Sequence, residues 1–404
     1  MKLIASIFAL SAVLIFALLI AIPAVAQDGE LDLLSQVDYQ FGSQIAYRGS
    51  LDTLDEITRA VVFMRPEGGG ETLVLEASFQ KEETASYRLE AILDVRSSPI
   101  RPFELWTYWW QVEFVNAPPA SSPSQKFRYE DNRFQWKSDS HDQIEIYWTE
   151  GGDERGSTLM QLTQDSLETL RRSLGLAPQG NLAIFVYPSS ADLQSGLRIG
   201  GGAPWVGAHT VPELGVVLLA ANNTPEAVIS IERDLPHELT HLLLYQRMGD
   251  NYSGLPAWLS EGLATLQEKQ ANPAYRFELE RAVESNALLT IESLCSAFPM
   301  AESDALLAYA QSASFTRYLL DVYGMGGILQ LLDAYQEGTS CTGGVQRVYQ
   351  RPLTQLESEW KNVHLQSPTT WQRLIPILPW GLLILPIILL VLIGLSARRK
   401  RNPA

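Results

Sequence analysis

The chain has 404 residues, which is enough for two globular domains in addition to targeting segments. Its 46 acidic and 30 basic residues give a formal net charge of −16. This balance argues against a nucleic-acid partner, and against an exported part that lies on anionic lipid.

The first 26 residues have the features of a secretory signal peptide. Lys2 precedes an apolar run over residues 3–22, and the sequence Ala-Val-Ala at residues 24–26 matches a cleavage site. An uncleaved N-terminal anchor is the alternative. In both cases the chain that follows is predicted to be exported.

Residues 30–148 are predicted to form a β-sandwich of the immunoglobulin-like or fibronectin type III-like kind. Short segments rich in β-branched and aromatic residues are separated there by Gly, Pro, Asp and Ser at the appropriate spacing. Residues 134–136 and 144–148 are predicted as closing strands, and residues 116–123 as a hairpin loop. The expected role is spacing or binding. Five tryptophans could line a ligand groove, although core packing is favoured: Trp106, Trp109, Trp110, Trp136 and Trp148.

Residues 155–365 are predicted to form a small mixed α/β lobe followed by a helical lobe. Residues 157–175 have the apolar spacing of a helix that ends at a glycine C-cap. The pattern after residue 256 is mostly helical. Three apolar runs predict buried strands between these helical parts: residues 181–187, 203–209 and 215–220.

A further helix is predicted to begin with Thr224 as its N-cap and Pro225 at its first position. It should extend to about residue 248. Pro236 lies inside this helix and is expected to kink or restart it.

The sequence His-Glu-Leu-Thr-His over residues 237–241 is the most informative motif of the chain. Residues four apart on a helix share one face, so His237 and His241 can bind one ion while Glu238 points beside it. A surface helix with two unrelated histidines is the alternative. The apolar flanks of the motif, and a total of only five histidines in the chain, favour a metal site.

A third ligand is predicted in the segment that follows. A catalytic zinc ion needs three protein ligands and one open coordination position. Glu261 lies twenty residues after His241 in an apolar segment, where a carboxylate is costly unless it is paired or metal-bound. The sequence therefore predicts a Zn²⁺ site formed by His237, His241 and Glu261.

This motif with its distant glutamate resembles that of the gluzincin metallopeptidases, the thermolysin-like group of zincins. The flanks over residues 235–241 and 256–264 are similar to the bacterial peptidase MA-like domain, and the similarity covers roughly residues 155–365. The resemblance implies a peptide or protein substrate. It also implies that Glu238 is the general base that takes a proton from the attacking water.

The resemblance implies three further roles. Tyr309 is the expected oxyanion donor, with a buried helix tyrosine as the alternative and His209 as a weaker candidate. Residues 215–220 would be the edge strand that pairs with an extended substrate, or else a plain core strand. Thermolysin has an aspartate four residues after its glutamate ligand. That position is Thr265 here, so Thr265 or Asp234 is expected to orient a ligand histidine.

The two cysteines, Cys295 and Cys341, both lie in the part predicted to be exported. A disulfide between them is the simplest interpretation in an oxidising compartment, and two buried free thiols are the alternative. Neither is expected to bind zinc, because the ligand set is complete without them.

Residues 374–396 are predicted to be a transmembrane helix, because they form an apolar segment of bilayer-spanning length. The basic residues of the tail at 397–404 should remain in the cytoplasm. A buried core helix is the alternative. The prediction is a single-pass protein of the cell membrane with its ectodomain outside the cytoplasm.

Together these features predict an α+β chain whose β-sandwich precedes a gluzincin-like domain and a membrane helix. The expected function is that of a membrane-anchored, extracytoplasmic zinc metallopeptidase, with endopeptidase and aminopeptidase activity both open. A surface binding or adhesion protein with an inactive zincin-like domain is the alternative. The intact Glu238 argues against that alternative, and the distance of the zinc motif from both apolar segments argues against an intramembrane protease.

Overall fold

The structure is a computed structural model that describes residues 29–83, 85–197, 207–299 and 301–365. The predicted signal peptide and transmembrane helix lie outside these residues. Within the described ranges, no helix is both long and apolar enough to cross a membrane.

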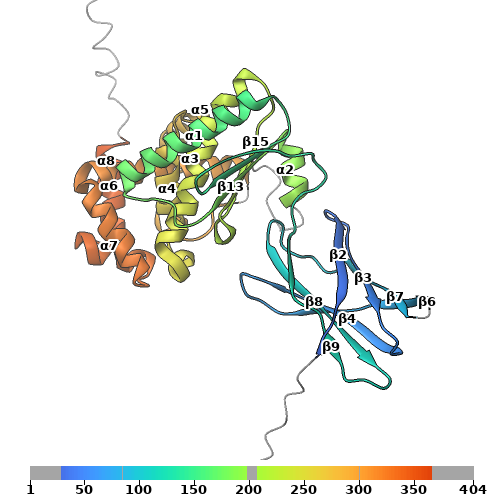
Figure 1. Ribbon diagram of the computed structural model, residues 1–404. Helices are drawn as coiled ribbons and strands as arrows, with labels where there is room; N and C mark the ends of the chain where they lie inside the picture. Colours follow the sequence, from blue (N-terminus) through green and yellow to red (C-terminus); the bar gives the residue numbers. More distant parts are fainter. Residues whose placement is uncertain (1–28, 84, 198–206, 300, 366–404) are drawn as a thin grey trace, which may run out of the picture. The chain divides into compact units, whose positions relative to one another are not determined.

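The chain forms two compact units (Figure 1). The first unit comprises residues up to Tyr39, Ile45–Leu93 and Trp106–Phe127, and the second comprises Gln40–Gln44, Asp94–Leu105 and everything from Arg128 onwards. The segment Asp94–Leu105, which joins two strands of the first unit, thus belongs to the second unit. The chain enters the second unit three times.

The first unit is built from two β-sheets. The strands of the six-stranded sheet are, in spatial order, β1 (Gly29–Glu30), β9 (Ala120–Ser121), β8 (Leu105–Phe114), β4 (Ile57–Pro66) and β5 (Leu73–Glu76), with β10 (Gln125–Arg128) also paired to β8. The strands of the four-stranded sheet are β2 (Leu33–Gln40), β3 (Gln44–Asp52), β7 (Ser86–Asp94) and β6 (Ser78–Glu83).

Aromatic side chains join the two sheets face to face. The ring of Tyr47 on β3 lies 5.0 Å from that of Tyr108 on β8. Trp110 on β8 donates its Nε1 hydrogen to Ser35 Oγ on β2 over 2.9 Å. Trp106 and Trp110 are 5% and 0% exposed. The core interpretation is therefore confirmed for these two tryptophans, and the predicted N-terminal β-sheets are present.

The predicted end of the sandwich is wrong. Residues 134–136 are not a strand; they precede β11 (Lys137–His141), which pairs with β12 (Ile144–Trp148). β12 in turn runs parallel to β13 (Leu182–Tyr187), so both strands belong to the sheet of the second unit. The alternation of apolar residues in β12 fits either sheet, and local sequence does not specify a partner so distant in the chain.

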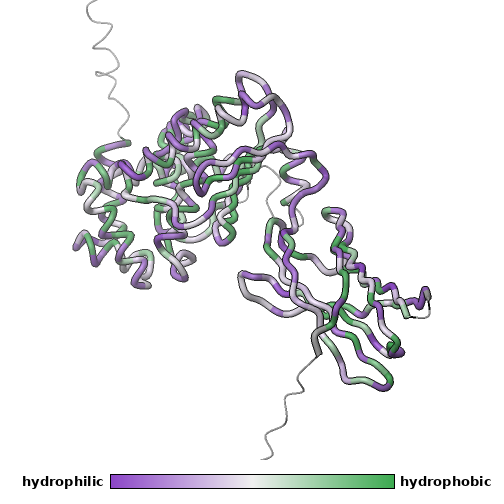
Figure 2. Tube along the Cα trace, viewed as in Figure 1, coloured by the Kyte–Doolittle hydropathy of each residue, from purple (hydrophilic) through white to green (hydrophobic). Residues whose placement is uncertain are grey.

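The sheet of the second unit has the order β11-β12-β13-β15-β14. β13 is buried at every residue, as expected for a strand with parallel neighbours on both sides. The tube is green along much of the central strands of this unit (Figure 2). β15 (Val216–Ala220) pairs with β13 on one side and with β14 (Ala208–Val211) on the other.

Helices cover both faces of this sheet (Figure 1). Leu182, Ile184 and Val186 of β13 face the apolar side chains of α1 (Asp153–Leu174) and α3 (Pro225–Met248). The alternate residues of β13 face α2 (Ser190–Leu197). α1 ends at Gly175, whose φ of 67° confirms the predicted glycine C-cap.

α3 is continuous through Pro236, so the predicted restart is wrong. A proline inside a helix leaves the carbonyl four residues earlier without its usual partner. Here that carbonyl belongs to Glu232, and it accepts a hydrogen bond from Lys269 N over 3.1 Å instead. The replacement satisfies the backbone and lets the helix continue.

The remaining helices form the predicted helical lobe: α4 (Ala257–Gln267), α5 (Pro273–Glu284), α6 (Glu302–Gln336), α7 (Cys341–Tyr349) and α8 (Leu353–Val363). α6 is interrupted at Gly324, where the backbone has φ 67° and ψ 178°. α4 packs closely on α6 at Gly262, because a Cβ there would lie 2.6 Å from Ser312 O. Only glycine allows this approach, which fixes the position of the neighbouring Glu261.

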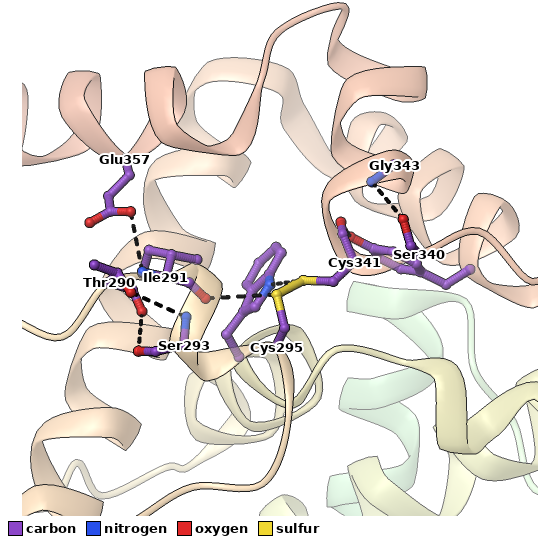
Figure 3. Close-up of a disulfide and its surroundings, with 10 residues drawn as sticks. Thr290, Ile291, Ser293, Cys295, Ser340, Cys341, Gly343 and Glu357 are labelled. Carbon is purple, nitrogen blue, oxygen red and sulfur yellow. Dashed lines mark hydrogen bonds between the residues drawn. A yellow bond between two sulfur atoms is a disulfide. The ribbon is translucent and has the colours of Figure 1, made fainter.

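The predicted disulfide is present between Cys295 and Cys341, at the start of α7 (Figure 3). The Cα atoms of the two cysteines are 6.0 Å apart. The buried Trp258 of α4 donates its Nε1 hydrogen to Cys341 Sγ over 3.4 Å. The bridge therefore lies against the helix that carries Glu261.

Replacing both cysteines by alanine is expected to lower the free energy of unfolding by about 2–4 kcal/mol, because the bridge restricts the unfolded chain. The closed loop spans 46 residues, which is long enough for a large entropic effect. Urea denaturation measures the change. A reducing agent should lower the urea midpoint of the native chain to that of the variant, and it should leave the midpoint of the variant unchanged. Equal midpoints for the untreated native chain and the variant would show that the bridge does not stabilise this unit.

Candidate metal centre

α3 presents two histidines on one side of the helix. Buried leucines at positions 235, 239 and 242 anchor the helix in the core of the second unit. His237 and His241 lie on the remaining face with side chains 12% and 13% exposed. The spacing of four residues brings both imidazoles together, as the sequence predicts.

Glu261 on α4 meets both histidines. Its Oε2 atom lies 3.3 Å from Nε2 of His237 and 3.3 Å from Nε2 of His241. One ligand atom from each of the three side chains lies within 4.8 Å of the others. The Glu261 Oε2 atom is buried and has no hydrogen-bond partner among the residues that the structure describes. Two imidazole nitrogens and an unsatisfied carboxylate oxygen form the three-ligand set of a catalytic zinc, so these residues fit the ion.

The three side chains are strongly coupled electrostatically. Burial opposes the charge of His237, but the neighbouring carboxylates of Glu261 and Glu268 outweigh it and raise the pKa of His237 to about 10. Burial likewise opposes ionisation of Glu261, yet His241 and His237 hold the pKa of that carboxyl well below its usual range. The chain therefore provides an anionic oxygen at the position between the two imidazoles.

Glu238 lies beside the triad and faces the cavity. A hollow of about 490 Å³ is lined by all three ligands, Glu238 and Tyr309, together with residues of β14. A second hollow of about 260 Å³ shares His237, Glu238 and Tyr309. Glu238 thus borders both hollows, from which a substrate can reach it.

Tyr309 of α6 stands next to the triad. Its ring lies 6.1 Å from that of His237 and 5.1 Å from that of Phe298. Burial and the nearby Glu261 raise the pKa of Tyr309, so its hydroxyl keeps its proton and can donate a hydrogen bond. His209 on β14 lines the larger hollow, and burial lowers its pKa below the ordinary value.

The family model of the peptidase MA superfamily matches residues 162–366, about half of the chain and the part that contains the triad. The chain belongs to the peptidase MA superfamily. The matched residues include His237, His241 and Glu261, which form the candidate zinc site of a metallopeptidase domain. A comparison with curated protein sequences finds no significant match.

Two solved structures are similar to this peptidase at low identity. An aminopeptidase N family protein from Idiomarina loihiensis is 8% identical, with 82% of this chain and 75% of that chain covered and a TM-score of 0.36. A purple acid phosphatase from yellow lupin (Lupinus luteus) seeds is 10% identical, with 48% of this chain covered and a TM-score of 0.22. This chain spans only 35% of the phosphatase. These TM-scores are too low to carry an argument about shared fold or function.

The residues that orient the ligand histidines of this peptidase differ from those expected. His237 Nδ1 lies 3.0 Å from Oε1 of Glu268, whose side chain is only 2% exposed. Asp234 pairs with Arg233 instead, and the buried hydroxyl of Thr265 has no hydrogen-bond partner within the described part of the chain. The expectation for Thr265 or Asp234 is therefore wrong.

His241 is oriented by a hydroxyl. Its Nδ1 lies 3.1 Å from Oγ of Ser260, the residue before Glu261. The Nδ1 atoms of both imidazoles therefore contact a residue on α4, Ser260, or the residue directly after it, Glu268. Their Nε2 atoms consequently face the metal position.

Pro236 explains how Glu268 reaches His237. Glu268 follows the last residue of α4, and the next residue, Lys269, donates its backbone hydrogen to the Glu232 carbonyl that Pro236 leaves free. This bond ties the end of α4 to α3 one turn before His237. A proline directly before the first ligand was the available sequence signal, since it frees a carbonyl for such a contact.

Replacing Glu268 by glutamine is expected to weaken zinc affinity about 10–100-fold, because an amide is a poorer partner for the His237 Nδ1 hydrogen than a carboxylate. Competition with a chromophoric chelator measures the affinity. Glu278→Gln, which changes a glutamate on α5 that pairs with Arg281, serves as the control and should bind zinc normally. Unchanged affinity in Glu268→Gln would show that the contact does not support the site.

Proposed function

We propose that this protein hydrolyses peptide bonds of peptide or protein substrates outside the cytoplasm, anchored to the cell membrane by its C-terminal segment. The observation that carries the proposal is the joint placement of the ligand triad and Glu238 at the wall of the larger hollow. A zinc ion held by His237, His241 and Glu261 supplies Lewis-acid activation of water and of the scissile carbonyl.

Glu238 is the proposed general base. Its Oε2 atom accepts a hydrogen bond from Thr210, so Oε1 is the oxygen free to take a proton from the attacking water. The same oxygen then delivers that proton to the leaving amine.

The substrate is proposed to pair with β14 rather than with the predicted strand over residues 215–220. That prediction is wrong because β15 already has a strand on each side, and β14 is the edge of the sheet among the described residues. β14 lines the larger hollow along its whole length. An extended peptide added to this edge would lie across Glu238.

Replacing Tyr309 by phenylalanine is expected to reduce kcat about 10²-fold, because the hydroxyl would no longer donate to the developing oxyanion. Steady-state kinetics on a cleaved peptide measures the loss, and KM should change little. Tyr275→Phe, which alters a neighbouring half-buried ring, is the matched control. An unchanged kcat in Tyr309→Phe would show that Tyr309 is a buried helix tyrosine without a catalytic role. His209 would then be the oxyanion donor to test.

The cellular location rests on the sequence of the two ends. The signal-like residues 1–26 and the apolar segment 374–396 with its basic tail support a single-pass membrane protein. The first unit, proposed to be immunoglobulin-like or fibronectin type III-like, would then serve as a spacer or binding unit on the outer side. Protease added to intact cells should degrade the second unit, and complete protection would contradict this topology.

The decisive test uses the purified, zinc-loaded, full-length chain and a diverse peptide library, with products identified by mass spectrometry. Cleavage that stops on chelation and returns with zinc supports the proposal. Internal cleavage would identify an endopeptidase, and stepwise loss of N-terminal residues an aminopeptidase. Absence of all cleavage despite stoichiometric zinc would contradict peptidase activity on such substrates.

A further inference from the structure

One residue outside the metal ligands is bound directly to Glu238. The Oγ1 atom of Thr210 lies 2.7 Å from Oε2 of Glu238 and 3.0 Å from the backbone oxygen of the same residue. Thr210 is 8% exposed, and among the described residues no other side chain hydrogen-bonds to this carboxylate. The orientation of the Glu238 carboxylate therefore depends on this hydroxyl.

The position of Thr210 in the sheet gives it a second role. The backbone oxygen of Gly207 accepts a hydrogen bond from the backbone N–H of Ala220. Because these bonds alternate along an antiparallel pair, residues 207, 209 and 211 direct their N–H and C=O groups toward β15. Ala208 and Thr210 then direct theirs toward the free edge. Thr210 thus offers its backbone N–H and C=O where an extended substrate would add, while its side chain holds Glu238.

Two threonines buried in helices satisfy their hydroxyls locally. Thr163 and Thr240 donate to carbonyls four residues earlier in their own helices. Thr210 instead reaches from a strand to a charged side chain on a different element. A hydrogen bond to a carboxylate is stronger than one to a neutral carbonyl, and it fixes the direction of the acceptor.

We propose that Thr210 is a positioning residue for Glu238 and links the binding of an extended substrate on β14 to the orientation of the base. The inference rests on the proposed function, since it assigns Thr210 a role in the same reaction. The hydroxyl fixes Oε2, which leaves Oε1 directed to the attacking water. A carboxylate that can rotate freely spends less time in that orientation, so kcat falls while substrate binding remains.

The test compares the zinc-loaded full-length chain with its Thr210→Val and Thr210→Ser variants. Valine keeps the shape and removes the donor, and it should lower kcat about 10–100-fold with KM and zinc content unchanged. Serine restores the hydroxyl and should bring kcat back to within about threefold of the native value. Thr163→Val is the matched control, because it removes one buried hydroxyl bond from α1 and should leave kcat unchanged.

Crystal structures of the zinc-loaded native chain and of Thr210→Val provide a readout that does not depend on turnover. The Glu238 carboxylate should occupy one conformation in the native chain and several in the variant. If no peptide is cleaved but this difference is found, the proposed function fails and the positioning role stands. A single unchanged Glu238 conformation in the variant, undiminished kcat, or a serine variant as impaired as valine would overturn the positioning role.

Discussion

Replacing Glu238 by glutamine is expected to reduce kcat about 10²–10⁴-fold while the protein keeps its zinc. Glutamine preserves the side-chain shape and still accepts the hydrogen bond from Thr210, so the geometry around the triad is retained. It cannot take a proton from water, and the reaction then lacks its base. Single-turnover kinetics on a peptide identified from the library measures the chemical step directly.

The control for this variant is Glu226→Gln, which changes an exposed glutamate in the first turn of the same helix. Its kcat and zinc content should equal those of the native chain. Full activity in Glu238→Gln with one equivalent of zinc would contradict the proposed base. Loss of zinc from that variant would instead show that Glu238 supports the metal site.

Replacing Glu261 by alanine is expected to abolish stoichiometric zinc binding and, with it, activity. Two imidazoles remain, and His237 keeps its contact with Glu268. A site without its carboxylate retains too few ligands, and it loses the anion that compensates the charge of the cation. Metal analysis after dialysis gives the occupancy, and His241→Ala should behave in the same way.

A second readout for Glu261→Ala is thermal unfolding with added zinc. Binding to the folded state alone raises the melting temperature of the native chain, and this increase should vanish in the variant. Glu284→Ala, at an exposed position at the end of α5, should retain the full increase. Stoichiometric zinc in Glu261→Ala would exclude this residue as a ligand.

The metal ligands could be predicted because their pattern is local. A spacing of four residues on one helix fixes two imidazoles on one face, and this holds whatever the rest of the fold. The carboxylate of Glu261 was recognisable from its apolar surroundings. The strands of the second sheet were also recognisable, but their order was not, because β12, β13 and β15 pair across long stretches of chain.

The residues that hold the site together could not be predicted in the same way. Glu268 lies two helical turns beyond Glu261, and only the bond from Lys269 to the Glu232 carbonyl brings it to His237. Thr210 comes from a strand with no sequence link to the zinc motif. Their roles arise from packing between elements, and nothing in the local pattern of either residue indicates them.

The path of the chain limits how this enzyme can be divided or recombined. Phe103 lies in the segment Asp94–Leu105, packs 4.6 Å from the ring of Phe185 on β13 and helps to line the larger hollow. This segment is encoded between two strands of the first unit. The first unit is therefore not an exchangeable module: a recombination event that replaced it would also replace a wall of the hollow next to the three candidate ligands. The two units are expected to be inherited together, and a change of the first unit would bring a change of the peptides that fit.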